Sequence, residues 1–422
     1  MNFARFNHVL VPQSAEERMA WLNSGRRKWL RGSYRLYLAL TPVGRGLLLF
    51  WLFAGALGLN VAEFVVYILW SVITGLIAAS LLFRRWYSLP RVQLKIDIPH
   101  RVTAGAPLSL SALLINSGTT VRAVRIQWPF LTWDGKYKSQ PDAVSTIVGG
   151  GQLQSSAVMT FSARGVHSLM PTMAMRVLPL GIACGPAIQS SIAEILVLPR
   201  VPSVHRLELP LRERCHPGGV PMMAHTGEAM ELAGVRPYQR GDRARDLHAR
   251  TWARVGVPHV RMYQQEFFTR MGIILDIHQH GLREARFEGA VSLAAGILAY
   301  LSRRDALVDI VCTGNHIHNL TIGRSLGFFQ QGLDLLATVA PGAPLEPEVL
   351  TTELVRHMDR LSGVFVITSH LNDEVLAMRA FCEHRQIPVR VLVITAKPSA
   401  EDTPGITSVP LETLHHDNGV WL

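Results

Sequence analysis

Met271-Gly-Ile-Ile-Leu-Asp-Ile277 is the stretch that decides the architecture of the C-terminal half of this 422-residue chain. Its short and nearly continuous apolar run predicts a buried strand. A helix with apolar residues along one face is predicted next, at Glu288–Arg303, and strand and helix patterns alternate after it. This alternation predicts a mostly parallel sheet flanked by helices, in which ligands bind at the carboxyl ends of the strands.

The remaining elements of this half follow from the same patterns. Strands are predicted at Ala306–Cys312, Gly363–Thr368 and Pro388–Ile394, with an edge hairpin through His318–Ile322. Helices are predicted at Phe328–Ala337, Pro347–Leu361 and Asn372–Arg385.

An arginine-rich segment, Gly234–Arg254, precedes the first of these strands. It holds six arginines, two aspartates, a histidine, a tyrosine and a tryptophan. Gly241-Asp242 predicts a tight turn whose aspartate caps a following helix, because Asp accepts from the free N–H groups of a first helical turn. Asp246 and Arg250 then lie four residues apart and can pair on one helix face. We therefore expect a self-paired arginine network in which Asp242 and Asp246 order the arginine face. This face is expected to dock the preceding connector or an acidic patch on a partner.

This segment resembles the domain of unknown function 58 family, a set of membrane-anchored bacterial proteins. The matching residues are Arg236, Tyr238, Gly241, Asp242, Arg245, Leu247, Ala253 and Arg254, and Asp246, His248 and Arg250 complete the candidate interaction surface. The family usually carries tryptophan just after the position of His248, where this chain has Ala249. The resemblance implies a C-terminal von Willebrand factor A-like domain. It also implies association with MoxR-type AAA+ ATPases, as a partner or adaptor in complex assembly or envelope maintenance.

Composition indicates a membrane-embedded part. The mean hydropathy is +0.20, and 42 basic against 31 acidic residues give a net charge of +11. Residues 46–83 are almost continuously apolar, which is too long for one span of about 20 residues. We therefore predict two spans, Thr41–Leu59 and Phe64–Phe83, which turn at Asn60–Glu63. Because arginines mark both outer ends, both ends are expected in the cytoplasm. The resemblance implies that the membrane of this multi-pass protein is the bacterial inner membrane. The four scattered cysteines fit a reducing compartment.

The region 88–200 is expected to fold as a β-sandwich of immunoglobulin-like architecture. Val92–Ile98 alternates apolar with polar residues, and Asn116–Gly118 supplies a turn. Gly149–Gly151 predicts the turn of a hairpin, since no Lys-Ser/Thr pair follows it to make a phosphate cradle.

The whole chain is thus predicted to be a multidomain membrane protein of five segments. A basic amphipathic segment at 1–40 is expected to lie among anionic lipid headgroups. The transmembrane hairpin at 41–87 and the β-sandwich at 88–200 follow it. A connector rich in proline and glycine occupies 201–235, and the α/β domain with its arginine-rich motif occupies 236–422.

A metal site is the first alternative to a binding role. In von Willebrand A domains the loop after the first strand often reads Asp-x-Ser-x-Ser and holds a divalent cation. Here the loop reads Asp276-Ile-His278-Gln-His280, which leaves only Asp276 and Thr368 as hard oxygen donors. Mg²⁺ requires an octahedral set of oxygens, so this site looks degenerate and no cofactor is expected. A softer metal held by Asp276, His278 and His280 would instead make the protein a metal-dependent hydrolase.

The sequence contains no motif of a known catalytic nucleophile or nucleotide site. It has no Gly-x-Ser-x-Gly elbow, Walker A lysine, Rossmann glycine fingerprint or His-Glu-x-x-His. We therefore predict a protein that is not an enzyme but a membrane-anchored scaffold or adaptor. Phosphate or nucleic-acid binding by the arginine-rich helix is the last alternative. Because two acids lie within that stretch, nucleic acid is not the expected partner.

Overall fold

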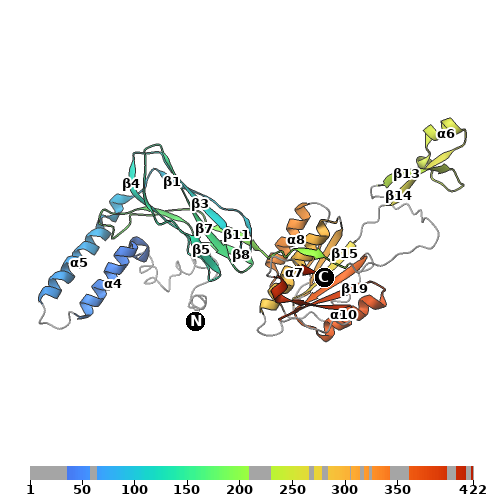
Figure 1. Cartoon of the computed structure of the whole chain (residues 1–422). Helices are drawn as coiled ribbons and strands as arrows, with labels where there is room; N and C mark the ends of the chain where they lie inside the picture. Colours follow the sequence, from blue (N-terminus) through green and yellow to red (C-terminus); the bar gives the residue numbers. More distant parts are fainter. Residues whose placement is uncertain are drawn as a thin grey trace, which may run out of the picture. The chain divides into compact units, whose positions relative to one another are not determined.

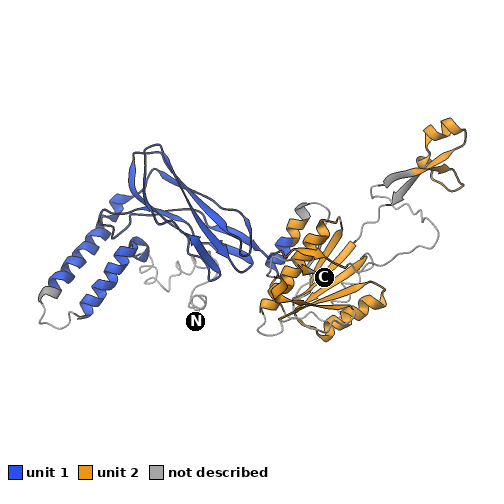
Figure 2. Cartoon of the chain, in the orientation of Figure 1, with its two compact units in different colours: residues 1–200, 333–339 blue, residues 201–332, 340–422 orange. Residues whose placement is uncertain are grey.

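The computed structural model (Figure 1) is a mixed α/β chain with several separate sheets. It describes residues 36–57, 64–208, 230–265, 270–277, 284–304, 306–313, 318–322, 326–342, 361–396, 405–414 and 420–421. The chain divides into two compact units (Figure 2). Unit 1 comprises Met1–Arg200 with Leu333–Val339, and unit 2 comprises Val201–Gly332 with Ala340–Leu422. Most of the predicted segment 1–40, the turn Asn60–Glu63 and most of the predicted helix Pro347–Leu361 lie outside the described residues.

Unit 1 begins with a pair of apolar helices. Helix α4 spans Pro42–Leu57, inside the predicted Thr41–Leu59, and α5 spans Phe64–Phe83, the bounds predicted for the second helix. They pack through Trp51 and Trp70, whose rings stack with centroids 5.3 Å apart, and Trp51 Nε1–H donates to Thr74 Oγ1 over 2.7 Å. Among the described helices, Tyr67–Tyr87 is long and apolar enough to cross a membrane, whereas Pro42–Ala56 is apolar but shorter.

Three sheets follow in unit 1, and all three contribute to one hydrophobic core. The first contains β1 (Val92–Asp97), β3 (Leu108–Asn116), β7 (Gln152–Phe161) and β5 (Gly135–Ser139), in that order. The second contains β10 (Ile188–Gln189), β9 (Met173–Arg176), β4 (Val121–Gln127) and β6 (Val144–Ile147). The third contains β2 (Arg101–Thr103), β11 (Ala193–Leu198) and β8 (Gly165–Leu169). The apolar residues of β3 recur at every second position, so one face of the strand is buried in that core.

Gly149–Gly151 does not close a hairpin, contrary to the prediction. The segment joins β6 to β7, and these strands belong to different sheets. Gly150 has φ +73, a conformation that favours glycine, so the need for a turn was inferred correctly. The sequence pattern shows where the chain turns but not which strands pair, because pairing depends on residues distant in sequence.

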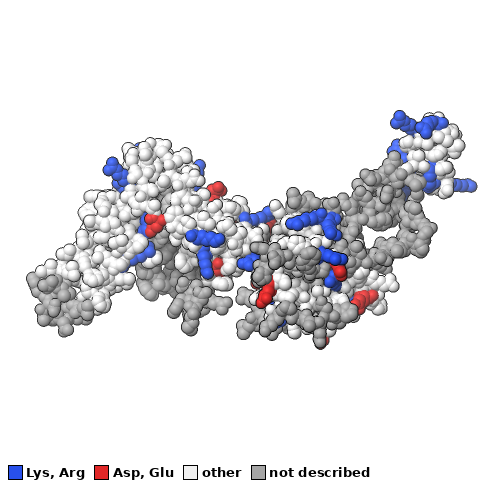
Figure 3. Space-filling model, in the orientation of Figure 1, with Lys and Arg blue, Asp and Glu red and all other residues white. Residues whose placement is uncertain are grey.

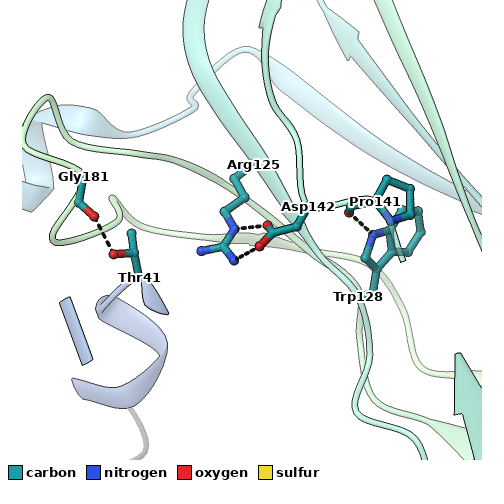
Figure 4. Close-up of polar contacts among 6 residues, drawn as sticks. All are labelled: Thr41, Arg125, Trp128, Pro141, Asp142 and Gly181. Carbon is teal, nitrogen blue, oxygen red and sulfur yellow. Dashed lines mark hydrogen bonds and ion pairs between the residues drawn. The ribbon is translucent and has the colours of Figure 1, made fainter. Parts of the chain in front are cut away.

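The helices of unit 1 are tied to its sheets through the loop Leu178–Cys184. Thr41 N–H donates to Ile182 O over 3.0 Å, and its hydroxyl donates to Gly181 O (Figure 4). The same hydroxyl accepts from Gly44 N–H over 3.0 Å, so Thr41 also caps the start of α4. A Cβ atom at Gly44 would lie 1.9 Å from Ile182 O, so only glycine allows this approach. Figure 4 also shows two contacts with the segment between β5 and β6: Arg125 of β4 donates to Asp142, and Trp128, which follows β4, donates to Pro141 O.

Unit 2 is built on a six-stranded sheet. Its order is β17 (His318–Ile322), β16 (Leu307–Thr313), β15 (Arg270–Asp276), β18 (Gly363–Thr368), β19 (Val389–Thr395) and β20 (Ile406–Pro410). All neighbours pair in parallel except β17, which is antiparallel at one edge. The predicted central strand is β15, and it is buried from Met271 to Asp276. The edge strand β20 was not predicted, because its sequence Ile-Thr-Ser-Val-Pro lacks an apolar run.

Helices cover both faces of this sheet. Val391 packs in one cluster with Val375 and Met378 of α10 (Asp373–His384). Ile394 lies three residues further along β19 and so on the opposite face, where it abuts Gly289 of α7 (Glu284–Ser302). Helix α7 starts four residues before its predicted position, and α8 occupies Leu326–Thr338. Two shorter pairings complete the unit. Strand β12 (Val204–Arg206) pairs with β21 (Val420–Trp421), and β13 (Met230–Pro237) pairs with β14 (His259–Gln265).

A buried ion pair joins two central strands of the unit 2 sheet. Arg270 donates from Nε to Asp309 Oδ2 over 2.8 Å and from Nη2 to Oδ1 over 3.1 Å. The Asp309 side chain is 1% exposed and that of Arg270 is 21% exposed. We predict that Asp309→Ala destabilises this sheet by about 3 kcal/mol, because it removes the carboxylate from a largely buried guanidinium.

Hydrogen exchange of the β15 and β16 amides in the full chain measures this loss locally. Glu383→Ala is the matched control, because its i,i+4 pair with Arg379 is partly exposed and contributes about 0.3 kcal/mol. Equal exchange in the two variants would contradict the prediction.

Candidate functional site

The arginine-rich segment forms a small module built on the β13–β14 hairpin. The two strands are antiparallel and place Arg236 opposite Val260. Between them lie a short 3₁₀ turn, Ala244–Asp246, and helix α6, Ala249–Val255. Figure 1 shows β13, β14 and α6 together in this module. Arg236, the first residue of the motif, thus lies in a strand, which the sequence did not predict.

Asp242 orders the start of the motif, although it does not cap a helix as predicted. Its Oδ2 accepts from Arg236 Nη1 over 2.8 Å and from Gln239 N–H over 2.8 Å, and its Oδ1 accepts from Arg236 Nη2 over 2.6 Å. Gly241 has φ +112, which favours glycine at this turn. The carboxylate is therefore occupied by a forked guanidinium and by the turn itself.

These hydrogen bonds shift both ionisation equilibria. The bond from Arg236, followed by the backbone N–H of Gln239, lowers the pKa of Asp242 below its ordinary value of 3.8. The bond to Asp242 raises the pKa of Arg236. Because the folded pKa of Asp242 is the lower one, its contribution to stability is present above the ordinary carboxyl pKa and is lost as the pH falls through the lowered pKa.

Asp246 and Arg250 do not share a helix, so their predicted pairing on one face is wrong. Asp246 ends the 3₁₀ turn and Arg250 lies in α6. Between them, Leu247 forms a strand-like bridge to Val260, and His248 N–H donates to His259 O over 2.8 Å. This pairing with β14 interrupts the helical backbone. His248 is the true N-cap of α6, because its Nδ1 accepts from Thr251 N–H over 3.3 Å.

Most side chains of the module point into solvent. The exposed arginines are Arg240, Arg243, Arg245, Arg250, Arg254 and Arg261. Tyr238 is 42% exposed and Trp252 is 43% exposed. Lys and Arg side chains dominate the charged surface of this module in Figure 3. An exposed arginine surface with aromatic rings is suited to binding an acidic partner, since Arg, Tyr and Trp carry much of the energy of protein interfaces.

The carboxyl end of the unit 2 sheet carries the other candidate residues. Strands β15 and β18 are neighbours, and Thr368 Oγ1–H donates to Asp276 Oδ2 over 2.8 Å. Asp276 is 7% exposed and Thr368 is fully buried. The structure therefore brings two of the four metal candidates together, while His278 and His280 lie outside the described residues. Within the part of the chain that is described, no group of three His, Cys, Asp or Glu side chains is arranged to hold a metal ion.

Comparisons with known proteins place the chain only loosely. No protein-family model matches it, and no curated protein matches it. It is similar to the manganese-loaded TRAP protein of Plasmodium vivax, with 12% identity, coverage of 34% of this chain and 69% of that one, and a TM-score of 0.28. It is also similar to the Ro (RSR) protein of Deinococcus radiodurans, with 12% identity, coverage of 35% and 32%, and a TM-score of 0.24.

A further solved structure is the cupredoxin domain of amoB from Nitrosocaldus yellowstonii. Its identity is 16%, with coverage of 26% of this chain and 88% of that one, and its TM-score is 0.18. TM-scores this low carry no argument about fold or function. The resemblance to the domain of unknown function 58 family therefore stays a prediction from the sequence.

We predict that Asp242→Ala opens the turn at the start of the module. Without the carboxylate, Gln239 N–H and the Arg236 guanidinium lose a shared acceptor. Limited digestion of the full chain with trypsin is then expected to cleave after Arg240 severalfold faster. Asp246→Ala is the matched control, since the structure gives Asp246 no ion pair in the described module, and it is expected to cleave at the native rate. Identical digestion of both variants would show that Asp242 does not order the turn.

Proposed function

We propose that this protein is a non-enzymatic scaffold or adaptor anchored in the bacterial inner membrane. The observation that carries the proposal is the outward surface of α4 and α5. Val43 is 69% exposed, Leu49 67%, Phe53 63% and Leu82 75%, all on two helices that pack on each other. Water does not solvate so large a continuous apolar surface well, whereas a bilayer does.

The remaining architecture of the proposal follows the two units. The hairpin α4–α5 spans the membrane with both ends in the cytoplasm. The two four-stranded sheets that share a core support an immunoglobulin-like sandwich. The six-stranded sheet, parallel except at one edge, supports a von Willebrand factor A-like domain. In this arrangement the soluble parts present their surfaces to cytoplasmic partners.

The partner that we propose is a MoxR-type AAA+ ATPase, or a client of it, in complex assembly or envelope maintenance. The resemblance of the motif residues implies this class. The exposed arginines support an acidic partner surface, because Asp242 is already occupied by Arg236 and so leaves the other arginines available. Charge complementarity of this kind raises association rates and selects partners.

One observation favours a second candidate, a metal-dependent hydrolase. Asp276 and Thr368 meet at the carboxyl end of a mostly parallel sheet, which is where such sheets bind ligands. Metal analysis of the purified chain after exposure to Zn²⁺ or Mn²⁺ separates the two candidates. We expect no stoichiometric metal in the native chain, and we expect the Asp276→Ala variant to have the same metal content as the native chain. Stoichiometric metal that Asp276→Ala abolishes would favour the hydrolase.

We predict that Val72→Lys combined with Leu76→Lys reduces membrane integration. The two side chains lie four residues apart on α5 and are 53% and 37% exposed. A lysine near the centre of a spanning helix costs about 2.5–3.5 kcal/mol on insertion. The carbonate-resistant fraction of the chain measures the effect, and Val144→Lys, on an exposed β-strand position, is the control. A native chain that carbonate releases completely would refute anchoring.

We also predict that Arg245→Glu weakens partner binding severalfold. Crosslinked pull-downs from membranes with ATP or ADP are expected to recover an AAA+ ATPase whose yield depends on the nucleotide. Arg303→Glu is the matched control, because it makes the same charge change at an exposed position after α7. Equal recovery with both variants would exclude the arginine module as the docking surface. A membrane pull-down without any ATPase would exclude the proposed partner.

A further inference from the structure

One end of the β sheets of unit 1 lies against the start of α4 and the end of α5. At the start of α4, Leu40 forms a strand-like bridge to Ala183, and Leu40 is buried in one cluster with Leu178 and Ile182. At the end of α5, the Arg176 guanidinium of β9 lies 4.9 Å from the centre of the Tyr87 ring. A Cβ atom at Gly185 would lie 2.0 Å from Tyr87 O. The sheets are therefore held close to the end of the helical pair where α4 begins and α5 finishes.

This end of unit 1 is rich in arginine. The helix ends contribute Arg45, Arg84 and Arg85, and the sheets contribute Arg91, Arg122 and Arg176. Arg176 Nε donates to Arg122 O over 3.1 Å, and Ser117 N–H donates to Arg91 O over 3.0 Å, which places these residues at the same end of the sheets as the Arg176–Tyr87 contact. The nearby carboxylate of Asp142 is already engaged by Arg125 through two hydrogen bonds of 2.5 and 2.7 Å. We call these six arginines the collar.

Two large apolar side chains stand in solvent beside the collar. Leu180 is 61% exposed, in the loop whose next residue, Gly181, accepts from the Thr41 hydroxyl at the start of α4. Trp86 is 77% exposed in the 3₁₀ turn that follows α5. Aromatic and arginine side chains with this placement are typical of the headgroup layer of a membrane. The loop Leu178–Ile182, however, belongs to the sheets and not to either helix.

We infer that the collar end of the β sheets is itself embedded in the headgroup layer of an anionic bilayer. Leu180 enters that layer beside Trp86, and Arg122 and Arg176 contact lipid phosphates. The inference rests on the proposed membrane anchoring and adds that the β domain contacts the lipid directly. A lipid surface fits better than a protein partner, because Leu180 and Trp86 are exposed at the end of unit 1 where the exposed apolar side chains of α4 and α5 also lie. Among the described residues at this end, the carboxylate of Asp142 is held by Arg125.

The test uses an environment-sensitive NBD label on single cysteines in the full chain, reconstituted into vesicles that contain anionic phosphatidylglycerol. Cys215 is replaced by serine, whereas Cys184, Cys312 and Cys382 are buried and are kept. Leu180→Cys reports on the collar, and Leu76→Cys reports on α5. Val166→Cys is the matched control, since Val166 is 60% exposed in β8, beyond the far end of β7. The ten residues of β7 span about 33 Å.

We expect lipids with a shallow nitroxide quencher to quench the label at Leu180→Cys severalfold more than at Val166→Cys. Replacing phosphatidylglycerol with zwitterionic lipid is expected to lower the quenching at Leu180→Cys. The quenching of Leu76→Cys by a deep nitroxide quencher is expected to stay unchanged. If Leu76→Cys is quenched while Leu180→Cys behaves like Val166→Cys, the β domain stands away from the bilayer and this inference fails alone. If Leu76→Cys is not quenched either, the membrane anchoring fails with it.

Discussion

Thr41 holds the helices and the sheets of unit 1 in a fixed relation. One residue caps α4, donates its N–H to Ile182 O and donates its hydroxyl to Gly181 O. The loop can approach α4 this closely because Gly44 has no Cβ atom to clash with Ile182 O. Because the start of α4 binds a loop about 140 positions later in the chain, the helices and the sheets have little freedom to move relative to each other. The orientation that we propose for the β domain at a membrane depends on this contact together with the Leu40–Ala183 bridge and the Arg176–Tyr87 contact.

The arginines of the chain serve different physical purposes according to their partners. Arg270 is largely buried and pairs with Asp309, since a desolvated guanidinium requires a carboxylate. Arg236 is part-buried and is committed to Asp242, where it shapes a turn. The other arginines of the β13–β14 module are exposed, as are Arg85, Arg91 and Arg122 of the collar. Exposed arginines of this kind add little to folding stability but create the positive surfaces that attract acidic proteins or lipid headgroups.

Local patterns predicted individual elements better than they predicted pairings. The bounds of α5 and β18 follow directly from apolar runs that end at charged or polar residues. The sequence could not show that β20 extends the sheet, because an edge strand with few apolar residues is stabilised by backbone pairing with β19. The sequence pattern also predicted a helix directly after Asp242, whereas the helix of the arginine motif is Ala249–Val255. Asp242 is a good capping residue by type, but the antiparallel partner β14 draws Leu247 and His248 out of helical geometry.

The sequence by itself determined the apolar helices, the alternation of strands and helices in the C-terminal half, and the concentration of arginines at Gly234–Arg254. These properties depend on composition and on periods of two or 3.6 residues, which are local. Only the tertiary structure decided which acid each arginine meets, that Thr368 donates to Asp276, and that Leu178–Cys184 lies against the start of α4. Those contacts join residues separated by long stretches of chain or by a change of backbone direction, so no local pattern specifies them.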